Sequence, residues 1–160
     1  MTLTFTVLVA PVSQQHGSRA TAFKGKLRWY VDSSKKKFFN EVLRESKHLM
    51  PVKPLQGPVQ MQMTFFIERP DVKSSKFRML PQTVKAQLLT NKSAIPAWSN
   101  ASNKSDVGNL AKGSLDALVK AGLMVNDAQV WHEDNSMYFT EEDLPPRIVV
   151  TVQHEDSYAP

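Results

Sequence analysis

The sequence predicts a single α+β domain over residues 1–160, in which a mixed β-sheet packs against helices. Three observations predict it. Apolar and polar residues alternate, as in half-buried strands, at 2–9 and 59–68, and 130–139 resembles a strand with polar interruptions. Helical periodicity occupies 32–50 and 110–121, and the two kinds of segment follow one another without regular alternation. A chain of 160 residues is long enough to bury one core.

The strands and the first helix are each predicted from local signals. Pro11 ends the first strand, and the strand at 59–68 has apolar residues at every second position. A last strand is expected at 148–152, after an acidic turn. Asp32 and the two serines that follow it offer caps for the helix at 32–50, whereas the polar stretch 13–28 reads as a loop.

Charge is distributed unevenly along the chain. Residues 1–105 hold 17 Lys and Arg against 5 Asp and Glu, whereas residues 106–160 hold 3 against 10. A basic half beside an acidic half favours a polyanion surface next to a cation-binding patch. With a net charge of +5, nucleic acid is the favoured polyanion. The alternative is that the basic residues are solvated helix faces.

Composition also excludes several classes of protein. The chain has no cysteine, which excludes a disulfide framework and a cysteine-based zinc site. No apolar run reaches the length of a membrane span, and the first 13 residues lack the basic start of a signal peptide. We therefore expect a cytoplasmic protein without a membrane partner.

Basic side chains in the first half are the candidate DNA contacts. They lie in the predicted loop and at the start of the first helix: Arg19, Lys24, Lys26, Arg28, Lys35, Lys36 and Lys37. Residues 69–105 are expected to form a long basic excursion from the core of the domain, with a short helix beginning at Pro81. Loops of this length tend to be functional or mobile. Trp98 is expected to pin the excursion to the core, the alternative being a contact with DNA.

The stretch 104–130 carries the chemistry. Asp106 precedes the helix at 110–121, Gly122 ends it, and Asp127 follows it. If the next strand folds back on the helix, the two carboxylates converge on a hard cation such as Mg²⁺. Lys112 would then lie beside that cation and face a phosphate, an arrangement that suits phosphodiester hydrolysis. The alternative interpretation makes Asp106 a helix cap and Asp127 a turn residue.

The same stretch resembles the core of the RusA-type Holliday-junction resolvases, phage and prophage endonucleases that cut four-way DNA junctions. The family pattern is Asp-x-Asp-Asn-Leu-x-Lys, then Asp-Ala-Leu, then Gly, then Asp-Asp-x-Gln. The chain matches this pattern at Asp106, Asn109, Leu110, Lys112, Asp116, Ala117, Leu118, Gly122, Asp127 and Gln129. The strong motif covers roughly 30 residues, and the rest of the chain fits in length and element order.

The resemblance implies a Mg²⁺-dependent endodeoxyribonuclease, with Mn²⁺ as a substitute, that acts in DNA recombination and repair. It implies a homodimer on branched DNA in the cytoplasm of a bacterial or phage-infected cell. Asp106 and Asp127 would hold the metal, and Lys112 would stabilise charge on the phosphate. Three further residues would support the site: Asn109, Asn126 and Gln129.

The chain departs from the family pattern at three positions. Gly108 and Asn126 replace aspartates, and Met137 stands near a position that is often basic. Because the first of these aspartates is a metal ligand in the family, one ligand is missing. Glu133 is no substitute, since six residues of strand separate it from Asp127 by about 20 Å.

Gly108 therefore leaves a second hypothesis open, a branched-DNA-binding protein with weakened or lost cleavage. A third hypothesis, a basic RNA- or ribosome-associated protein, rests on charge alone. Preference for four-way junctions over linear duplex and RNA separates the first two hypotheses from the third. Cleavage with Mg²⁺ or Mn²⁺ separates the first from the second.

Overall fold

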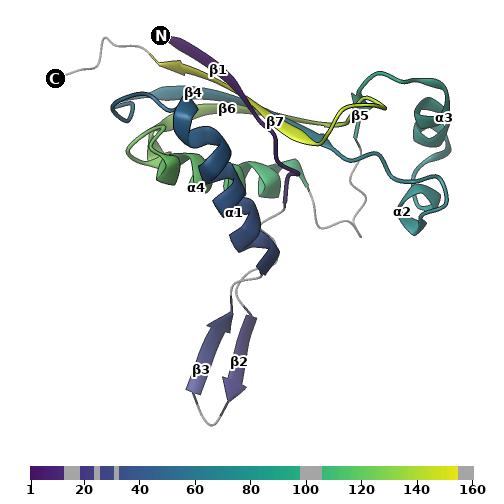
Figure 1. Ribbon diagram of the computed structural model, residues 1–160, viewed down its shortest axis with the longest axis horizontal. Helices are drawn as coiled ribbons and strands as arrows, with labels where there is room; N and C mark the ends of the chain where they lie inside the picture. Colours follow the sequence, from purple (N-terminus) through teal and green to yellow (C-terminus); the bar gives the residue numbers. More distant parts are fainter. Residues whose placement is uncertain (13–18, 24–25, 31–32, 98–105, 155–160) are drawn as a thin grey trace.

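The strand segments expected from the sequence come together in one sheet. The computed structural model describes residues 1–12, 19–23, 26–30, 33–97 and 106–154, without the side chains of 19–23, 26–30 and 33–35. Within these residues, five strands form a mixed sheet in the order β1-β7-β4-β6-β5 (Figure 1). The strands are β1 (Thr2–Val7), β4 (Val59–Ile67), β5 (Ile95–Pro96), β6 (Val130–Phe139) and β7 (Arg147–His154).

The pairing of β4 with β6 decides where the candidate site residues lie. Neighbouring strands are antiparallel except for β4 and β6, which run parallel. Val59 pairs with Val130, so both strands begin at the same end of the sheet. Parallel neighbours need a crossover connection, and residues 68–129 supply it. The α+β class with a mixed sheet is thereby confirmed.

Two helices cover one face of the sheet (Figure 1). They are α1 (Ser33–Ser46), which continues as η1 (Lys47–Leu49), and α4 (Val107–Ala121). Met61, Met63 and Phe65 of β4 are fully buried beneath them, against Val42 of α1 and Leu118 of α4. Burying a side chain of this size stabilises the fold by about 1.5–3 kcal/mol.

The opposite face of the sheet is polar and accounts for the alternation along its strands. The side-chain hydroxyls of Thr4 and Thr151 form a hydrogen bond of 3.2 Å across β1 and β7. Those of Thr64 and Ser136 form another of 3.2 Å across β4 and β6. One buried face and one wet face are typical of sheets with antiparallel neighbours. In the part of the chain described, no helix is long and apolar enough to cross a membrane.

Residues 69–97, called here the α2–α3 lobe, lie at one end of the sheet (Figure 1). The lobe contains α2 (Ser75–Arg78), capped by the Ser74 side chain, and α3 (Gln82–Thr90), with Pro81 at its N-cap. The helix expected at Pro81 is confirmed. Four buried side chains form a small core between the lobe and the sheet: Phe77, Leu80, Ile95 and Phe139.

Two segments expected to be loops contain strands. The polar loop expected at 13–28 is wrong in part, because β2 (Arg19–Phe23) and β3 (Lys26–Tyr30) form an antiparallel hairpin. The signals for the hairpin were present in the sequence, because both short strands alternate polar and apolar residues and Gly25 between them is a turn signal. Within the excursion expected at 69–105, residues 95–96 form β5 and join the sheet, and Trp98 lies outside the described residues.

Candidate active site

Asp106 occupies the N-cap of α4, where helix physics explains its geometry. Its backbone is extended, with φ −80° and ψ 159°. Its Oδ1 accepts a hydrogen bond from the backbone N–H of Asn109 at 2.8 Å. Asn109 Nδ2 donates a second hydrogen bond to Oδ2 at 2.6 Å. Asn109 therefore fixes the orientation of the carboxylate, which the positive end of the helix dipole also favours.

Gly108 lies in the first turn of α4 and is exposed. Its backbone does not have the positive φ that favours glycine. A Cβ placed on Gly108 would lie 3.6 Å from Oδ1 of Asp106, which is an ordinary van der Waals contact. Neither backbone conformation nor space requires glycine here. A carboxylate at this position would lie beside that of Asp106.

Lys112 projects from the same side of α4 as position 108. Gly108, Lys112 and Asp116 are spaced by four residues, which places them on one helix face. Lys112 is exposed and Asp116 is half-buried, whereas Leu110 and Leu118 on the opposite side belong to the core. The apolar side of α4 thus turns this polar row away from the sheet, with Lys112 one turn beyond Gly108.

Asp127 begins the short 3-10 helix η2 (Asp127–Gln129) and is exposed. Asn126 and Gln129 form a capping box around it, in which Gln129 Oε1 accepts the N–H of Asn126 at 2.8 Å. Gln129 Nε2 donates to the carbonyl oxygens of Leu55 and Gly57 at 3.0 and 2.8 Å. Two of the three residues predicted to support the site, Asn126 and Gln129, thus build the turn that carries Asp127, and Gln129 ties it to the segment before β4.

Asp106 and Asp127 lie at opposite ends of α4. The 15 residues of this helix rise about 22 Å. The chain passes through Asp127 before β6 begins, at the end of the sheet where β4 also begins (Figure 1). The expected convergence required Asp127 to return to the N-terminus of α4, and the chain does not do so. Within one chain the two carboxylates are not brought together.

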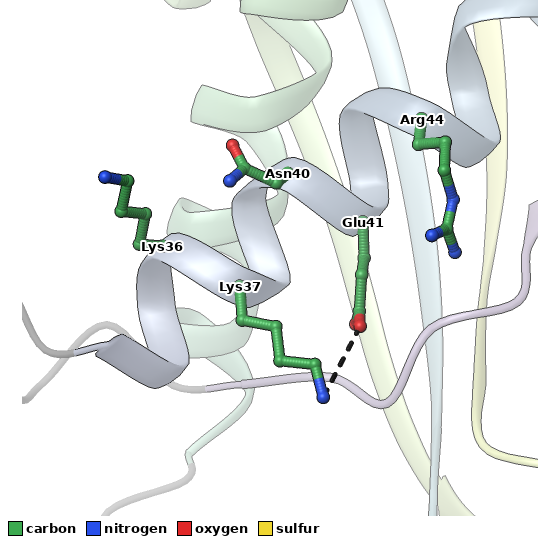
Figure 2. Close-up of a pocket in the computed structure, with 5 residues that line it drawn as sticks. All are labelled: Lys36, Lys37, Asn40, Glu41 and Arg44. Atoms are coloured by element: carbon green, nitrogen blue, oxygen red, sulfur yellow. Dashed lines mark ion pairs between the residues drawn. The ribbon is translucent and has the colours of Figure 1, made fainter.

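The exposed side of α1 carries an open groove of about 470 Å³ (Figure 2). It is lined by Lys36, Lys37, Asn40, Glu41 and Arg44. Lys37 Nζ lies 3.8 Å from Glu41, an exposed ion pair of the kind that contributes little and can exchange for a phosphate. Lys36 has no ion-pair partner in the described part of the chain.

Asn40 and Arg44 were missed as candidate DNA contacts. The signal that could have found them is spacing, because Lys36, Asn40 and Arg44 are each four residues apart and share one face of α1. Arg44 lies 2.9 Å from Glu45 in another exposed pair. The groove therefore extends the predicted basic patch along the helix.

The remaining predicted DNA contacts lie mostly in the hairpin, which extends away from the sheet and helices (Figure 1). Arg19 pairs in register with Tyr30, Arg28 with Thr21, and Lys26 with Phe23, so the three cations occupy positions on one hairpin face. Lys24 lies outside the described residues, as does the side chain of Lys35.

Comparison with known families decides the identity of the fold. The family model for Endodeoxyribonuclease RusA matches residues 9–153, nearly the whole chain. The chain belongs to the RusA endodeoxyribonuclease family. The match runs from just after β1 almost to the end of β7, far beyond the motif around α4. No curated protein matches the chain. Membership in the RusA family implies Holliday-junction resolvase activity.

A single RusA-family chain with this sequence fits Mg²⁺ poorly. Across the residues that the structure describes, no three His, Cys, Asp or Glu side chains gather where they could hold a metal ion. At the start of α4, Asp106 offers one carboxylate, and Asn109 already donates to both of its oxygens. Gly108 offers no ligand. One partly engaged carboxylate is a weak site for a cation that surrenders its water reluctantly.

Lys112→Ala should leave junction binding nearly intact and lower the cleavage rate by about 10²-fold or more, because charge on the phosphate would lose its stabilising partner. Equilibrium binding and single-turnover cleavage of the same junction measure the two effects. Lys120→Ala is the matched control, since it removes the same charge from the exposed last turn of α4. Equal losses of binding and rate would show an ordinary phosphate contact instead.

Charge reversal at Lys35, Lys36 and Lys37 should weaken junction binding without changing metal affinity. Junction affinity should also fall steeply with salt, because bound phosphates release counterions. Fluorescence anisotropy over a salt series measures both effects. Lys53→Glu is a control, as this exposed residue precedes β4 outside the α1 groove. A flat salt response would remove the nucleic-acid interpretation.

Proposed function

We propose that this chain is a structure-specific, divalent-cation-dependent endodeoxyribonuclease that resolves four-way DNA junctions in recombination and repair. The observation that carries the proposal is the start of α4. Asp106 is held there by Asn109, and the exposed Lys112 lies one helical turn beyond Gly108, in a chain that the Endodeoxyribonuclease RusA model matches. Such an enzyme would act on DNA in the cytoplasm of a bacterial or phage-infected cell.

The separation of the two carboxylates supports a homodimer as the active form. About 22 Å of helix keeps Asp106 and Asp127 apart in one chain. In a two-fold dimer, Asp106 of one protomer can meet the partner's Asp127, and symmetry then forms the second site at the same time. Two equivalent sites suit a four-way junction, in which two opposed strands are cut.

Each protein group has a defined task in this proposal. Asp106 and the partner's Asp127 would together hold the divalent cation, which would supply a Lewis acid for the hydrolysis of the phosphodiester. Asn109 orients the Asp106 carboxylate through its two hydrogen bonds. Lys112 approaches the phosphate from the exposed face of α4 and stabilises the charge that develops on it. The α1 groove and the hairpin hold the DNA backbone through their cations.

A second candidate function, a branched-DNA-binding protein with weakened cleavage, is favoured by Gly108. The position accepts a side chain, yet it carries no ligand. Binding by the basic surfaces does not depend on this position, whereas metal affinity does. Junction binding without cleavage in Mg²⁺ or Mn²⁺ would select this function.

Competition binding tests the preference for four-way junctions, which both candidate functions require. A labelled four-way junction is bound at fixed salt and challenged with unlabelled junction, linear duplex and RNA duplex. The proposal predicts that the unlabelled junction competes at least about 10-fold better than either duplex, in line with the span between specific and non-specific binding. Equal competition by RNA would support a basic RNA-associated protein instead.

A further inference from the structure

The α2–α3 lobe is strongly basic, and the proposed site does not use it. Residues 69–97 hold six cations, namely Arg69, Lys73, Lys76, Arg78, Lys85 and Lys92. Asp71 is their one acidic residue, and its carboxylate accepts the backbone N–H of Lys73 at 2.7 Å. The excess of positive charge therefore has little compensation within the lobe.

Arg69 and Lys92 fix the lobe to the sheet. The Arg69 guanidinium donates to the carbonyl oxygen of Thr140, at the end of β6, at 2.6 Å. It also donates to the carbonyl oxygens of Leu88, Asn91 and Ser93, around the C-terminal end of α3. Lys92 Nζ lies 3.1 Å from Glu142, and this hydrogen bond raises the pKa of Lys92. These contacts and the shared core around Phe139 make the lobe an extension of the sheet.

The other four cations are presented to solvent. Phe77 is buried in the core of the lobe, so its neighbours Lys76 and Arg78 are turned outward and exposed. Lys73 is exposed as well, and Lys85 is half-buried on α3. In the described part of the chain, none of the four forms an ion pair. Cations without carboxylate partners, on a lobe that is itself anchored to the sheet, suit the phosphate backbone of a nucleic acid.

The lobe also lies at the end of the molecule where α4 begins. β5 leads the chain out of the lobe toward α4, and the first turn of α4 points to the same end of the molecule (Figure 1). The helix α1, whose side chains line the groove, and the hairpin both lie away from the lobe (Figure 1). DNA held at the start of α4 would therefore meet the lobe as a separate contact.

We propose that the α2–α3 lobe binds the phosphate backbone of a junction arm, outside the crossover, through Lys73, Lys76, Arg78 and Lys85. The inference rests on the proposed function, because it takes the DNA to be held at the start of α4. The positive charge of the lobe and its attachment to the sheet suit duplex DNA, whose phosphates are regularly spaced. Such contacts position the duplex without reading its sequence.

The test compares the unmodified protein with the double variant Lys76→Ala/Arg78→Ala on two junctions. One junction has arms of about 25 base pairs and the other has arms of about 6, which is less than one helical turn. The variant should bind the long-armed junction about 10-fold more weakly, and its salt slope should fall by about 2. Binding to the short-armed junction should not change, nor should the melting temperature, because both side chains are exposed.

Lys47→Ala/Lys53→Ala is the matched control, since it removes two exposed charges that precede β4 and lie outside the lobe. It should bind both junctions as the unmodified protein does. If the lobe variant keeps full affinity and salt slope on the long-armed junction, the lobe inference is wrong while the proposed function stands.

Linear duplex separates the two proposals. If the unmodified protein binds linear duplex as well as the junction, the proposed function fails. A loss in the lobe variant on long duplex would then still support a DNA contact by the lobe. If the protein binds no DNA, both proposals are overturned.

Discussion

Gly108→Asp should raise metal affinity and the junction-cleavage rate together, by about 10²-fold or more, because carboxylate charge tunes hard-cation affinity over many orders of magnitude. The structure accommodates the change, since a Cβ at 108 meets Oδ1 of Asp106 at 3.6 Å. Two adjacent carboxylates repel one another until a cation binds between them. The variant should therefore also gain a Mg²⁺-dependent rise in melting temperature that the unmodified protein lacks.

Gly108→Asn is the control for this prediction, because it adds a side chain of similar size without the charge. It should raise neither the cleavage rate nor the Mg²⁺-dependent melting temperature. Calorimetric Mg²⁺ titration and single-turnover cleavage provide the readouts. If the unmodified protein cleaves at full speed in low Mg²⁺ and Gly108→Asp adds nothing, another ligand completes the site, and Asp106 and Asp127 are not the only carboxylates that hold the metal.

A mixture of two inactive variants should regain activity if the site is shared between protomers. Asp106→Asn and Asp127→Asn should each lower the cleavage rate on the order of 10³-fold, because loss of the metal removes several kcal/mol of charge stabilisation. In a mixed dimer, the protomer that keeps Asp106 meets the partner that keeps Asp127. One site of the pair is then intact. Nicking of one strand, without paired cleavage, is the expected product.

The matched control mixes Asp106→Asn with Lys112→Ala. Both residues belong to the N-terminal half of α4, so they serve the same half of a shared site. Each of the two sites in this mixed dimer then contains one substituted residue, and activity should not return. The experiment uses the Gly108→Asp background, in which the rate is high enough to follow. If the first mixture also stays inactive, Asp106 and Asp127 do not act across an interface.

The parts of the fold that the sequence predicted well have local causes. Gly122 ends α4 with φ 98°, which glycine adopts without strain, and Asp106 caps its first turn. The helix starts at Val107, three residues before the predicted start, because the cap comes directly before it. The alternation of apolar and polar residues along 59–67 likewise follows from the two faces of the sheet, one buried and one exposed to solvent.

The parts that sequence could not predict depend on contacts between distant segments. The position of Asp127 depends on the parallel pairing of β4 with β6, and on Gln129 binding the carbonyl oxygens of Leu55 and Gly57. No spacing within 104–130 reveals that pairing. The lobe is similar, because Arg69 donates to carbonyl oxygens as much as 71 residues away in the chain.

Cleavage of a synthetic four-way junction across a metal titration tests whether the start of α4 carries a metal-dependent junction nuclease. We expect symmetric nicks near the crossover, slow and only at high Mg²⁺ or with Mn²⁺ in the unmodified protein. The nicks should be fast at low Mg²⁺ in Gly108→Asp and absent on linear duplex. Cleavage that persists in a chelator, or no cleavage by Gly108→Asp at any metal concentration, would show that the start of α4 is not such a site.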